Sequence, residues 1–269
     1  MNLPKYLKIH LHSGIGDCIK TLTCNYPLLS LNKKYGTEII TTYGGEGTND
    51  CGWESLIKNE LISHIEGFSY VSNKEYELLK HPTVESFFKN HAKNLLLESH
   101  LPFQFKNPKT CLTKHVRRIA IQTDSNDSRK KYPIENWAAI TKVIVERDEH
   151  THVYLFDAPN RREYINKNID TTHERVYNMA GKELWESVSL LQKMDLIISP
   201  DSYSKYIALC SRIPAILLCC ELEYIGVDEM LRTCFNGIHN NDNYKLLGLY
   251  PEPIQDISEI DTKEIVSFI

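Results

Sequence analysis

The apolar residues of Val176–Leu218 change their spacing twice, and this stretch constrains the fold more than any other part of the chain. Helical spacing over Leu184–Met194 gives way to the continuous apolar run Leu196–Ile198, and helical spacing returns over Tyr206–Cys210. A proline then ends the second helix, and the short apolar run Ala215–Leu218 has the character of a buried parallel strand. The stretch therefore predicts a βαβ unit at the centre of an α/β fold.

The turn between the first strand of this unit and its second helix has the sequence Ser199-Pro200-Asp201-Ser202. Ligands of open α/β sheets bind outside the carboxyl ends of the strands, and the predicted unit puts this turn there. Asp201 or Ser202 would cap the helix, and the free backbone N–H groups of its first turn would face an anion such as a diphosphate. Local chemistry leaves both interpretations open, a helix cap and a ligand site.

The central stretch also resembles the family-9 glycosyltransferases of the lipopolysaccharide heptosyltransferase type. The residues that fall at the family's spacing, without gaps, are Asn178-Met179-Ala180-Gly181-Lys182, Asp195-Leu196-Ile197-Ile198, Asp201-Ser202, Ala208 and Pro214. Two positions depart from the family pattern, because its glycine after Asp-Ser/Thr is Tyr203 here and its helical histidine is Tyr206. The resemblance places both residues against the sugar-nucleotide donor.

The first strand and turn of the chain resemble the same family. Tyr6–Leu11 alternates as a strand does and leads into Ser13-Gly14-Ile15-Gly16-Asp17, a glycine turn that opens a helix. The dinucleotide fingerprint G-x-G-x-x-G is incomplete because its third glycine position is Ile19, which disfavours an NAD-dependent oxidoreductase. The family's first turn, in which Gly-Asp is followed by two apolar residues and Thr-Leu, fits Gly16–Leu22 better.

Two further segments match the family after predicted strands of the second half. After the strand Arg117–Gln122 comes Lys130-Lys131-Tyr132-Pro133, which with Trp137 follows the family pattern K-x-W-P-x-x-x-W and its donor-phosphate lysine. On charge alone, the alternative is a solvated basic loop. After the strand Val153–Phe156, Glu163 stands within a residue or two of the family's ribose-binding glutamate.

The resemblance implies an α/β protein of the GT-B class, with two Rossmann-like domains facing across a cleft. Residues 1–113 would form the N-terminal acceptor-side domain and residues 114–269 the C-terminal nucleotide-sugar-binding domain, with the last helix returning to the first domain. The residues implied in donor binding are Gly16, Lys130, Glu163, Gly181, Asp201, Ser202, Tyr203 and Tyr206.

The implied function is that of an inverting, metal-independent glycosyltransferase, which moves a sugar from a nucleotide-diphosphate sugar to an acceptor hydroxyl. Asp17 is the candidate general base for that hydroxyl, and no cofactor is expected because the donor is a co-substrate. A saccharide is the default acceptor, and a nucleic acid would enter only as an acceptor, through a hydroxymethylated DNA base. The alternative is a nucleotide-sugar-binding protein without catalysis, because Tyr203 and Tyr206 replace family residues near the donor.

The composition is that of a globular protein long enough for two domains. The 269 residues are 42% hydrophobic and 25% charged, and a formal net charge of −4 gives no global attraction to nucleic acid. The eight cysteines show no CxxC pattern and predict reduced core residues of a cytosolic protein instead of a disulfide framework or zinc site. No window reaches about 18 apolar residues, so we expect no integral membrane segment and a cytoplasmic location.

Overall fold

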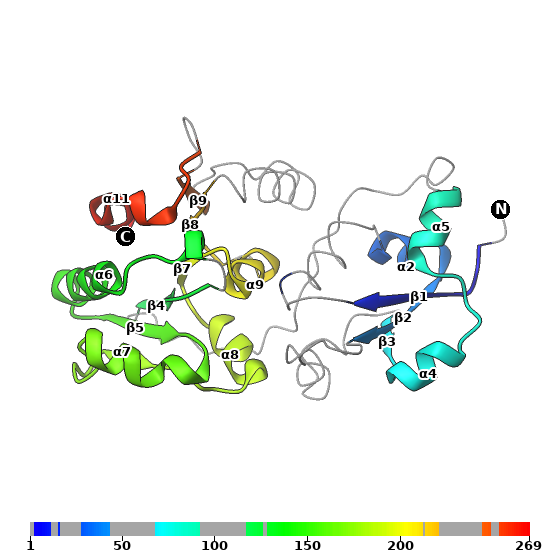
Figure 1. The fold of residues 1–269 in the computed structure, drawn as a ribbon, viewed down its shortest axis with the longest axis horizontal. Coiled ribbons are helices and arrows are strands. Elements are labelled where there is room, and N and C mark those ends of the chain that lie inside the picture. The colour runs from blue at the N-terminus through cyan, green and yellow to red at the C-terminus, as the bar shows by residue number, and fades with distance from the viewer. Residues whose placement is uncertain are drawn as a thin grey trace. The chain divides into compact units, whose positions relative to one another are not determined.

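The structure is a computed structural model, and it describes residues 3–11, 16, 28–43, 68–91, 117–125, 128–211, 213–220, 244–248 and 253–269. Two compact units make up the chain, one of Met1–Lys106 with Glu229–Gly237 and the other of Asn107–Asp228 with Ile238–Ile269 (Figure 1). The predicted domain boundary, between residues 113 and 114, lies outside the described residues.

The first unit is built on a parallel three-stranded sheet in the order β1-β2-β3. Its described strands are β1 (Tyr6–Leu11), β2 (Glu38–Tyr43) and β3 (Phe68–Tyr70), and its described helices are α2 (Leu28–Tyr35), α4 (Asn73–Leu78) and α5 (Val84–His91). Along β1, Leu7, Ile9 and Leu11 are buried, while the residues between them are half-buried. This period of two is that of a strand with one face in a core. The predicted first strand is confirmed.

The second unit contains a six-stranded sheet in the order β6-β5-β4-β7-β8-β9, and the described pairings in it are parallel. The strands are β4 (Arg117–Gln122), β5 (Thr151–Phe156), β6 (Val176–Asn178), β7 (Leu196–Pro200), β8 (Ala215–Leu218) and β9 (Tyr244–Leu247). Counted in chain order within this unit, the strands run 3-2-1-4-5-6 across the sheet, which is the order of a doubly wound Rossmann-like domain. The strand order therefore reverses between β4 and β7.

Helices cover both faces of this sheet, with α6, α7 and α11 on one face and α8 and α9 on the other (Figure 1). The described helices are α6 (Ile134–Arg147), α7 (Arg162–Asn168), α8 (Leu184–Leu191), α9 (Tyr203–Ser211) and α11 (Thr262–Ser267), with short 3₁₀ turns at η3 (Ser128–Lys130), η4 (Pro159–Arg161) and η5 (Ile257–Glu259). Ile119 and Ile121 of β4 share one core with the fully buried Trp137 of α6. Ala120, which points to the opposite face, is fully buried as well. Burial on both faces explains why these strands read as continuous apolar runs.

The central stretch of the sequence folds as predicted. α8, β7, α9 and β8 follow one another, and β7 pairs in parallel with β8. The first of these helices ends at Leu191, so Met194 lies in the turn that follows. β6 and β9 have no counterpart in the predictions, since strands of three and four residues are too short to show a period. Trp53–Leu61, whose apolar spacing predicts a helix, lies outside the described residues.

The terminal helix α11 packs on α6 of the second unit. Ile265 and Val266 are buried in the core of that unit, and Arg147 of α6 donates to the main-chain oxygen of Val266 at 3.0 Å. The family resemblance implies instead that this helix returns to the first domain. Ile257 and Ile260, just before α11, already belong to the core of the second unit, so the chain reaches the helix from within that core.

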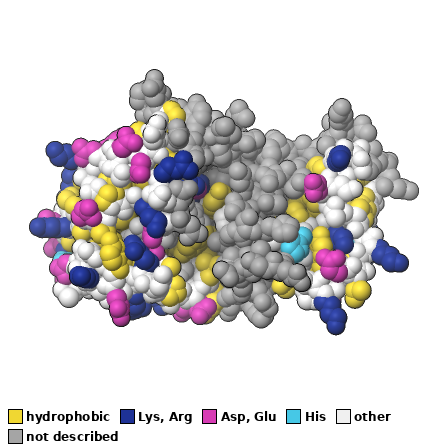
Figure 2. Space-filling view, viewed as in Figure 1, with side chains coloured by type: hydrophobic (Ala, Val, Ile, Leu, Met, Phe, Trp, Pro, Cys, Tyr) yellow, Lys and Arg dark blue, Asp and Glu magenta, His cyan; other side chains and the backbone are white. Residues whose placement is uncertain are grey.

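Charged side chains of both signs are interspersed on the face of the second unit that Figure 2 shows. This distribution agrees with the small formal net charge of −4. A mixed surface of this kind creates no broad field of one sign on that face.

Within the described residues, no helix combines the length and the apolar character needed to span a membrane.

We expect Gly248→Ala to destabilise the protein strongly. Gly248, after β9, has a φ of +86°, and an added Cβ would lie 2.2 Å from the main-chain oxygen of Cys219. Left-handed backbone costs a non-glycine residue about 1–2 kcal/mol, and the collision with backbone adds to this cost. Gly36→Ala is the matched control, because Gly36 has a φ of +67° but nothing within 4 Å of an added Cβ. Urea unfolding should show the larger loss at Gly248, and equal losses would contradict the packing argument.

Candidate functional site

The candidate site lies where the strand order of the second unit reverses, between β4 and β7. These two strands are parallel neighbours, with Ile121 opposite Ile198. Their carboxyl ends therefore share one edge of the sheet, and the chain leaves them in opposite directions, toward β5 and toward β8. Ligands of doubly wound sheets bind in the crevice at such a switch point. The loop after β4 carries Lys130 and the turn after β7 carries Asp201, so the fold brings these two predicted residues together.

The carboxylate of Asp201 holds the ammonium groups of two lysines. Lys130 reaches Oδ2 from the 3₁₀ turn η3, and Lys205 reaches Oδ1 from the first turn of α9. Ser125, in the loop after β4, donates from its hydroxyl to the main-chain oxygen of Asp201 at 2.9 Å. The two loops at the switch point are therefore joined through one residue.

The two lysines differ in exposure. The side chain of Lys205 is 3% exposed, whereas those of Asp201 and Lys130 are 17% and 19% exposed. The ammonium of Lys205 also lies 4.8 Å from the centre of the Tyr206 ring, which is within cation–π distance. In this lysine–aspartate cluster of Lys130, Asp201 and Lys205, Lys205 is thus the buried lysine and Lys130 is the more exposed one.

Burial and charge oppose each other in the lysine–aspartate cluster. Burial works to raise the pKa of Asp201, but the ammonium groups of Lys205 and Lys130 hold that pKa below its ordinary value. Burial works to lower the pKa of Lys205, but Tyr206 and Asp201 raise it above its ordinary value. Both shifts favour the ionised forms, so Asp201 and Lys205 form an ion pair at neutral pH.

The helix-cap interpretation of Asp201 has no support among the described contacts. Its two carboxylate oxygens accept from lysines, and no described hydrogen bond joins its side chain to a backbone N–H of α9. The first turn of α9 is closed by the main chain, since the N–H of Lys205 donates to the oxygen of Ser202 at 3.2 Å. The Asp201 carboxylate therefore binds the ammonium groups of Lys130 and Lys205 at the start of the helix.

Buried aromatic residues fix the loop that carries Lys130. Tyr132 and Trp137 are 3% and 0% exposed, and their ring centres lie 4.9 Å apart. Trp137 donates to the main-chain oxygen of Thr123 at 3.0 Å, and the hydroxyl of Tyr132 donates to that of Ile260 at 2.8 Å. Burial raises the pKa of Tyr132 to about 12, so this hydroxyl remains a donor. The aromatic positions of the lysine motif are therefore core residues that position the lysine.

A second charged network joins the loops after β4 and β5. Nε of Arg161 lies 3.4 Å from Oδ2 of Asp124 and 3.6 Å from Oδ2 of Asp157. The hydroxyl of Thr123 donates to Asp157 at 2.6 Å. Burial raises the pKa of Asp157, although the hydrogen bonds from Thr123 and from the Ala158 N–H work to lower it. This network fixes the β5 side of the switch point.

Ser202 is half-buried and directly precedes α9. Tyr203 is the first residue of that helix. Burial raises the pKa of the Tyr203 hydroxyl to about 12, against a hydrogen bond with Ser187 of α8 that lowers it. α8 and α9 pack against each other. Tyr203 therefore contributes to the packing of these two helices beside the lysine–aspartate cluster.

Gly181 and Glu163 have no described contact with the lysine–aspartate cluster. Gly181, in the turn after β6, has a φ of +87°, and Arg162 donates to the neighbouring main-chain oxygen of Ala180 at 3.0 Å. Asn178 donates in turn to the main-chain oxygen of Arg162 at 3.0 Å. These two hydrogen bonds thus join the turn of Asn178–Gly181 to the start of α7. Glu163 is exposed in the first turn of α7.

The predicted residues of the first glycine turn belong to the first unit and are described only in part. Gly16 is helical and half-buried. Asp17, the candidate general base, lies outside the described residues. Its role stays a prediction.

Lys205 is the member of the lysine–aspartate cluster that the sequence analysis did not predict. Its signal is the i,i+4 spacing from Asp201, which places two side chains on one side of a helix. Asp201 precedes the helix, however, so this spacing is informative only once the geometry of the turn is known.

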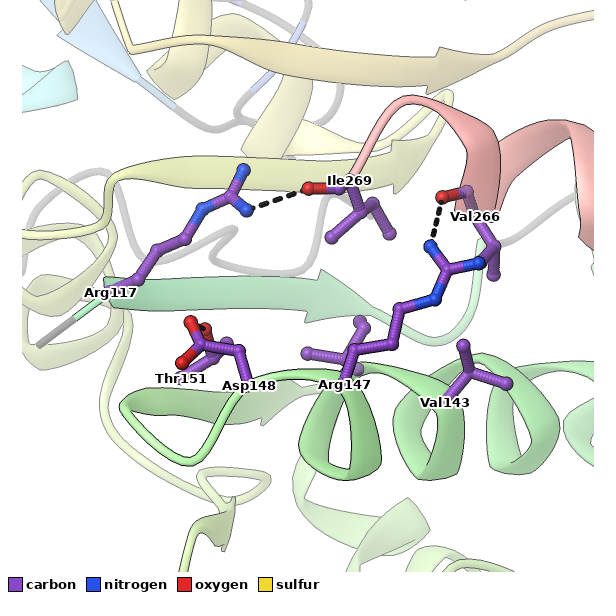
Figure 3. A pocket seen from close by; sticks show the side chains of 8 residues that line it. Arg117, Val143, Arg147, Asp148, Thr151, Val266 and Ile269 are labelled. Carbon is purple, nitrogen blue, oxygen red and sulfur yellow. Dashed lines mark hydrogen bonds between the residues drawn. The ribbon is translucent and has the colours of Figure 1, made fainter.

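A small cavity lies at the opposite edge of the same sheet, at the amino end of β4 (Figure 3). Arg117 donates to the main-chain oxygen of Ile269 at 2.8 Å, and Arg147 donates to that of Val266, so both guanidinium groups reach the end of α11. The cavity has a volume of about 40 Å³, which is room for water and not for a sugar nucleotide.

Several solved heptosyltransferases have the same fold as this chain. The E. coli ADP-heptose lipopolysaccharide heptosyltransferase II is 14% identical over 98% of this chain and 97% of its own, with a TM-score of 0.57. E. coli heptosyltransferase WaaC, solved with ADP-2-deoxy-2-fluoro heptose, is 11% identical over 98% of both chains, with a TM-score of 0.57. The iron-containing dodecameric heptosyltransferase TibC of enterotoxigenic E. coli is 13% identical over 80% of this chain and 58% of its own, with a TM-score of 0.54. These likenesses show that the chain has the GT-B fold.

The family follows from the sequence itself. The model of glycosyltransferase family 9 (heptosyltransferase) matches residues 69–218, more than half of the chain, and the protein belongs to this family. Among curated proteins, none matches the sequence. The matched range includes the loop of Lys130 and the turn of Asp201, so the resemblance inferred from the motifs is confirmed and the protein is a glycosyltransferase.

Proposed function

We propose that the protein transfers a sugar from a nucleotide-diphosphate sugar to an acceptor hydroxyl by a single displacement, which inverts the anomeric configuration. The observation that carries this proposal is the cluster of Lys130, Asp201 and Lys205 outside the carboxyl ends of β4 and β7. Two ammonium groups on one carboxylate leave one net positive charge at the start of α9, where helix N–H groups add partial positive charge. A departing diphosphate is the group that this charge fits.

Lys130 is the proposed ligand of the donor diphosphate, because it is the more exposed of the two lysines on Asp201. Asp201 holds Lys130 in position, and the main chain at Ser202 and Tyr203 supplies N–H groups toward the phosphates. The remaining donor-binding residues proposed from the family pattern are Gly16, Glu163, Gly181 and Tyr206.

The diphosphate is proposed to leave without a metal, because Lys130 and the start of α9 supply the positive charge that its departure requires. TibC is described as iron-containing, so this point is tested directly. Treatment with EDTA should leave the transfer rate unchanged. A loss of activity that a metal ion restores would contradict the proposal.

A saccharide hydroxyl is the proposed acceptor, and Asp17 is the proposed base that takes its proton. The test incubates the protein with a panel of ADP-, UDP- and GDP-sugars and measures nucleoside diphosphate release. ADP-heptose heads the panel, because the solved E. coli enzymes are named for it or carry its analogue. Saccharides and DNA containing hydroxymethylated bases are added as acceptors in parallel reactions. Release that an acceptor accelerates is the expected result, and donor binding without release would favour a non-catalytic binding protein.

Lys130→Ala is expected to weaken donor binding by about 1–3 kcal/mol, because it removes a charge-assisted contact to phosphate. The fold should survive, since Asp201 keeps Lys205 as its partner. Lys131→Ala is the matched control, because Lys131 is 49% exposed and its Nζ lies 3.6 Å from Oδ1 of Asp124. Calorimetric titration with the sugar nucleotide that the panel selects should show the loss at Lys130 alone. Equal losses would indicate a diffuse basic loop.

A further inference from the structure

Lys205 is too deeply buried to contact a donor with its own ammonium. Its side chain is 3% exposed, against 19% for Lys130 on the same carboxylate. Buried ammonium groups are kept when they are paired, and here the partners are Oδ1 of Asp201 and the Tyr206 ring. Lys205 can therefore act on the donor only through the groups that it contacts, and Asp201 is the one that it shares with Lys130.

The shared carboxylate sets up a competition for Lys130. A donor diphosphate would share the ammonium of Lys130 with Asp201, whose negative charge already offsets that of Lys130, and a carboxylate beside the diphosphate also repels it. Lys205 weakens both effects, because its positive charge on Oδ1 offsets the negative charge of Asp201. Without Lys205, Asp201 and Lys130 would form a closed pair of opposite charges.

The turn at the end of β7 holds this arrangement rigidly. The hydroxyls of Ser199 and Ser204 meet at 2.6 Å, and both side chains are fully buried. Ser204 directly precedes Lys205 on α9, so the helix fixes the direction from which the buried ammonium reaches Asp201. Lys130 comes instead from a short 3₁₀ turn on another loop.

We infer that Lys205 is a positioning residue of the donor site, which offsets the charge of Asp201 from the buried side and so leaves Lys130 available to the donor diphosphate. This inference rests on the proposed function. It assigns a task to a residue that the sequence motifs do not single out.

The test measures the affinity for ADP, UDP and GDP by calorimetry in Lys205→Met and Lys205→Arg. The Met variant keeps the chain length without the charge, and its dissociation constant should rise about tenfold or more. The donor KM should rise with kcat little changed, because Lys205 acts on binding. Lys205→Arg keeps the charge and should restore most of the affinity. Lys142→Met is the matched control, because Lys142 pairs with Glu146 at the same i,i+4 spacing but is 73% exposed.

A double variant separates positioning from direct contact. Lys130→Ala combined with Lys205→Met should lose less affinity for the nucleotide than the sum of the two single losses, because the part of the Lys205 effect that passes through Lys130 disappears once Lys130 is removed. Additive losses would overturn the inference, and so would unchanged affinity in a folded Lys205→Met. If the Met variant does not fold, Lys205→Gln, which still donates to Asp201, replaces it in both comparisons. A wild type that binds none of the three nucleotides overturns the proposed function and the inference with it, whereas additivity in variants of a binding wild type overturns the inference alone.

Discussion

Asp17→Asn is expected to abolish sugar transfer while leaving donor affinity within a few-fold of that of the wild type. A general base contributes about 10²–10⁴-fold to such a reaction, and an amide does not take the acceptor's proton. In the proposed mechanism Asp17 faces the acceptor hydroxyl and not the diphosphate, so the loss should fall on kcat. Nucleotide release in the presence of acceptor measures the rate of sugar transfer. Calorimetric titration with the nucleoside diphosphate measures the affinity of the donor site.

Two results would remove Asp17 from this role. Activity above about a tenth of the wild-type value would mean that another group takes the proton. A parallel loss of donor affinity would place the carboxylate in the donor site. Asp170→Asn is the control, because this exposed carboxylate accepts a hydrogen bond from Thr172 in a turn of the second unit. That variant should change neither quantity.

Apolar periodicity was sufficient to predict the middle of the second unit but not the edges of its sheet. β4 matches its prediction because Ile119, Ala120 and Ile121 are buried on both faces and so form a continuous run. β6 and β9 are the two edge strands, and they contain three and four residues. Among the described strands, each pairs with one neighbour, so its place is set by that pairing and leaves little trace in the local sequence.

The candidate site was predictable where topology decides it and unpredictable where side-chain placement does. Lys130 and Asp201 lie 71 positions apart, yet parallel strands with adjacent carboxyl ends must bring their loops together. The pairing of Lys205 with Asp201 depends on how the turn enters α9, which no spacing in the sequence specifies. The contacts of Arg161 with Asp124 and Asp157 likewise require three side chains from two loops to converge.

Asp201→Ala is expected to lower the free energy of unfolding by about 3–5 kcal/mol, the cost of breaking a buried ion pair from one side. It leaves the ammonium of Lys205, whose side chain is 3% exposed, without its carboxylate partner. A helix cap alone would contribute about 0.5–2 kcal/mol, so urea unfolding separates the two roles. Because the pKa of Asp201 is lowered in the folded state, its contribution is present above the ordinary aspartate pKa and is lost as the pH falls through the folded pKa.

The double variant Asp201→Ala/Lys205→Met tests whether the buried charge is the cause of that loss. It removes the unpaired ammonium as well as the carboxylate, so it should regain most of the stability that the single variant loses. Glu146→Ala is the matched control, because Glu146 and Lys142 form an exposed i,i+4 pair, 61% and 73% exposed, of a kind worth less than about 1 kcal/mol. A loss below about 2 kcal/mol for Asp201→Ala, or a double variant no more stable than the single one, would mean that Asp201 does not hold Lys205 in the folded protein. Ser125 and the main chain would then join the two loops without the charges, and the lysine–aspartate cluster would no longer support a diphosphate site at the switch point.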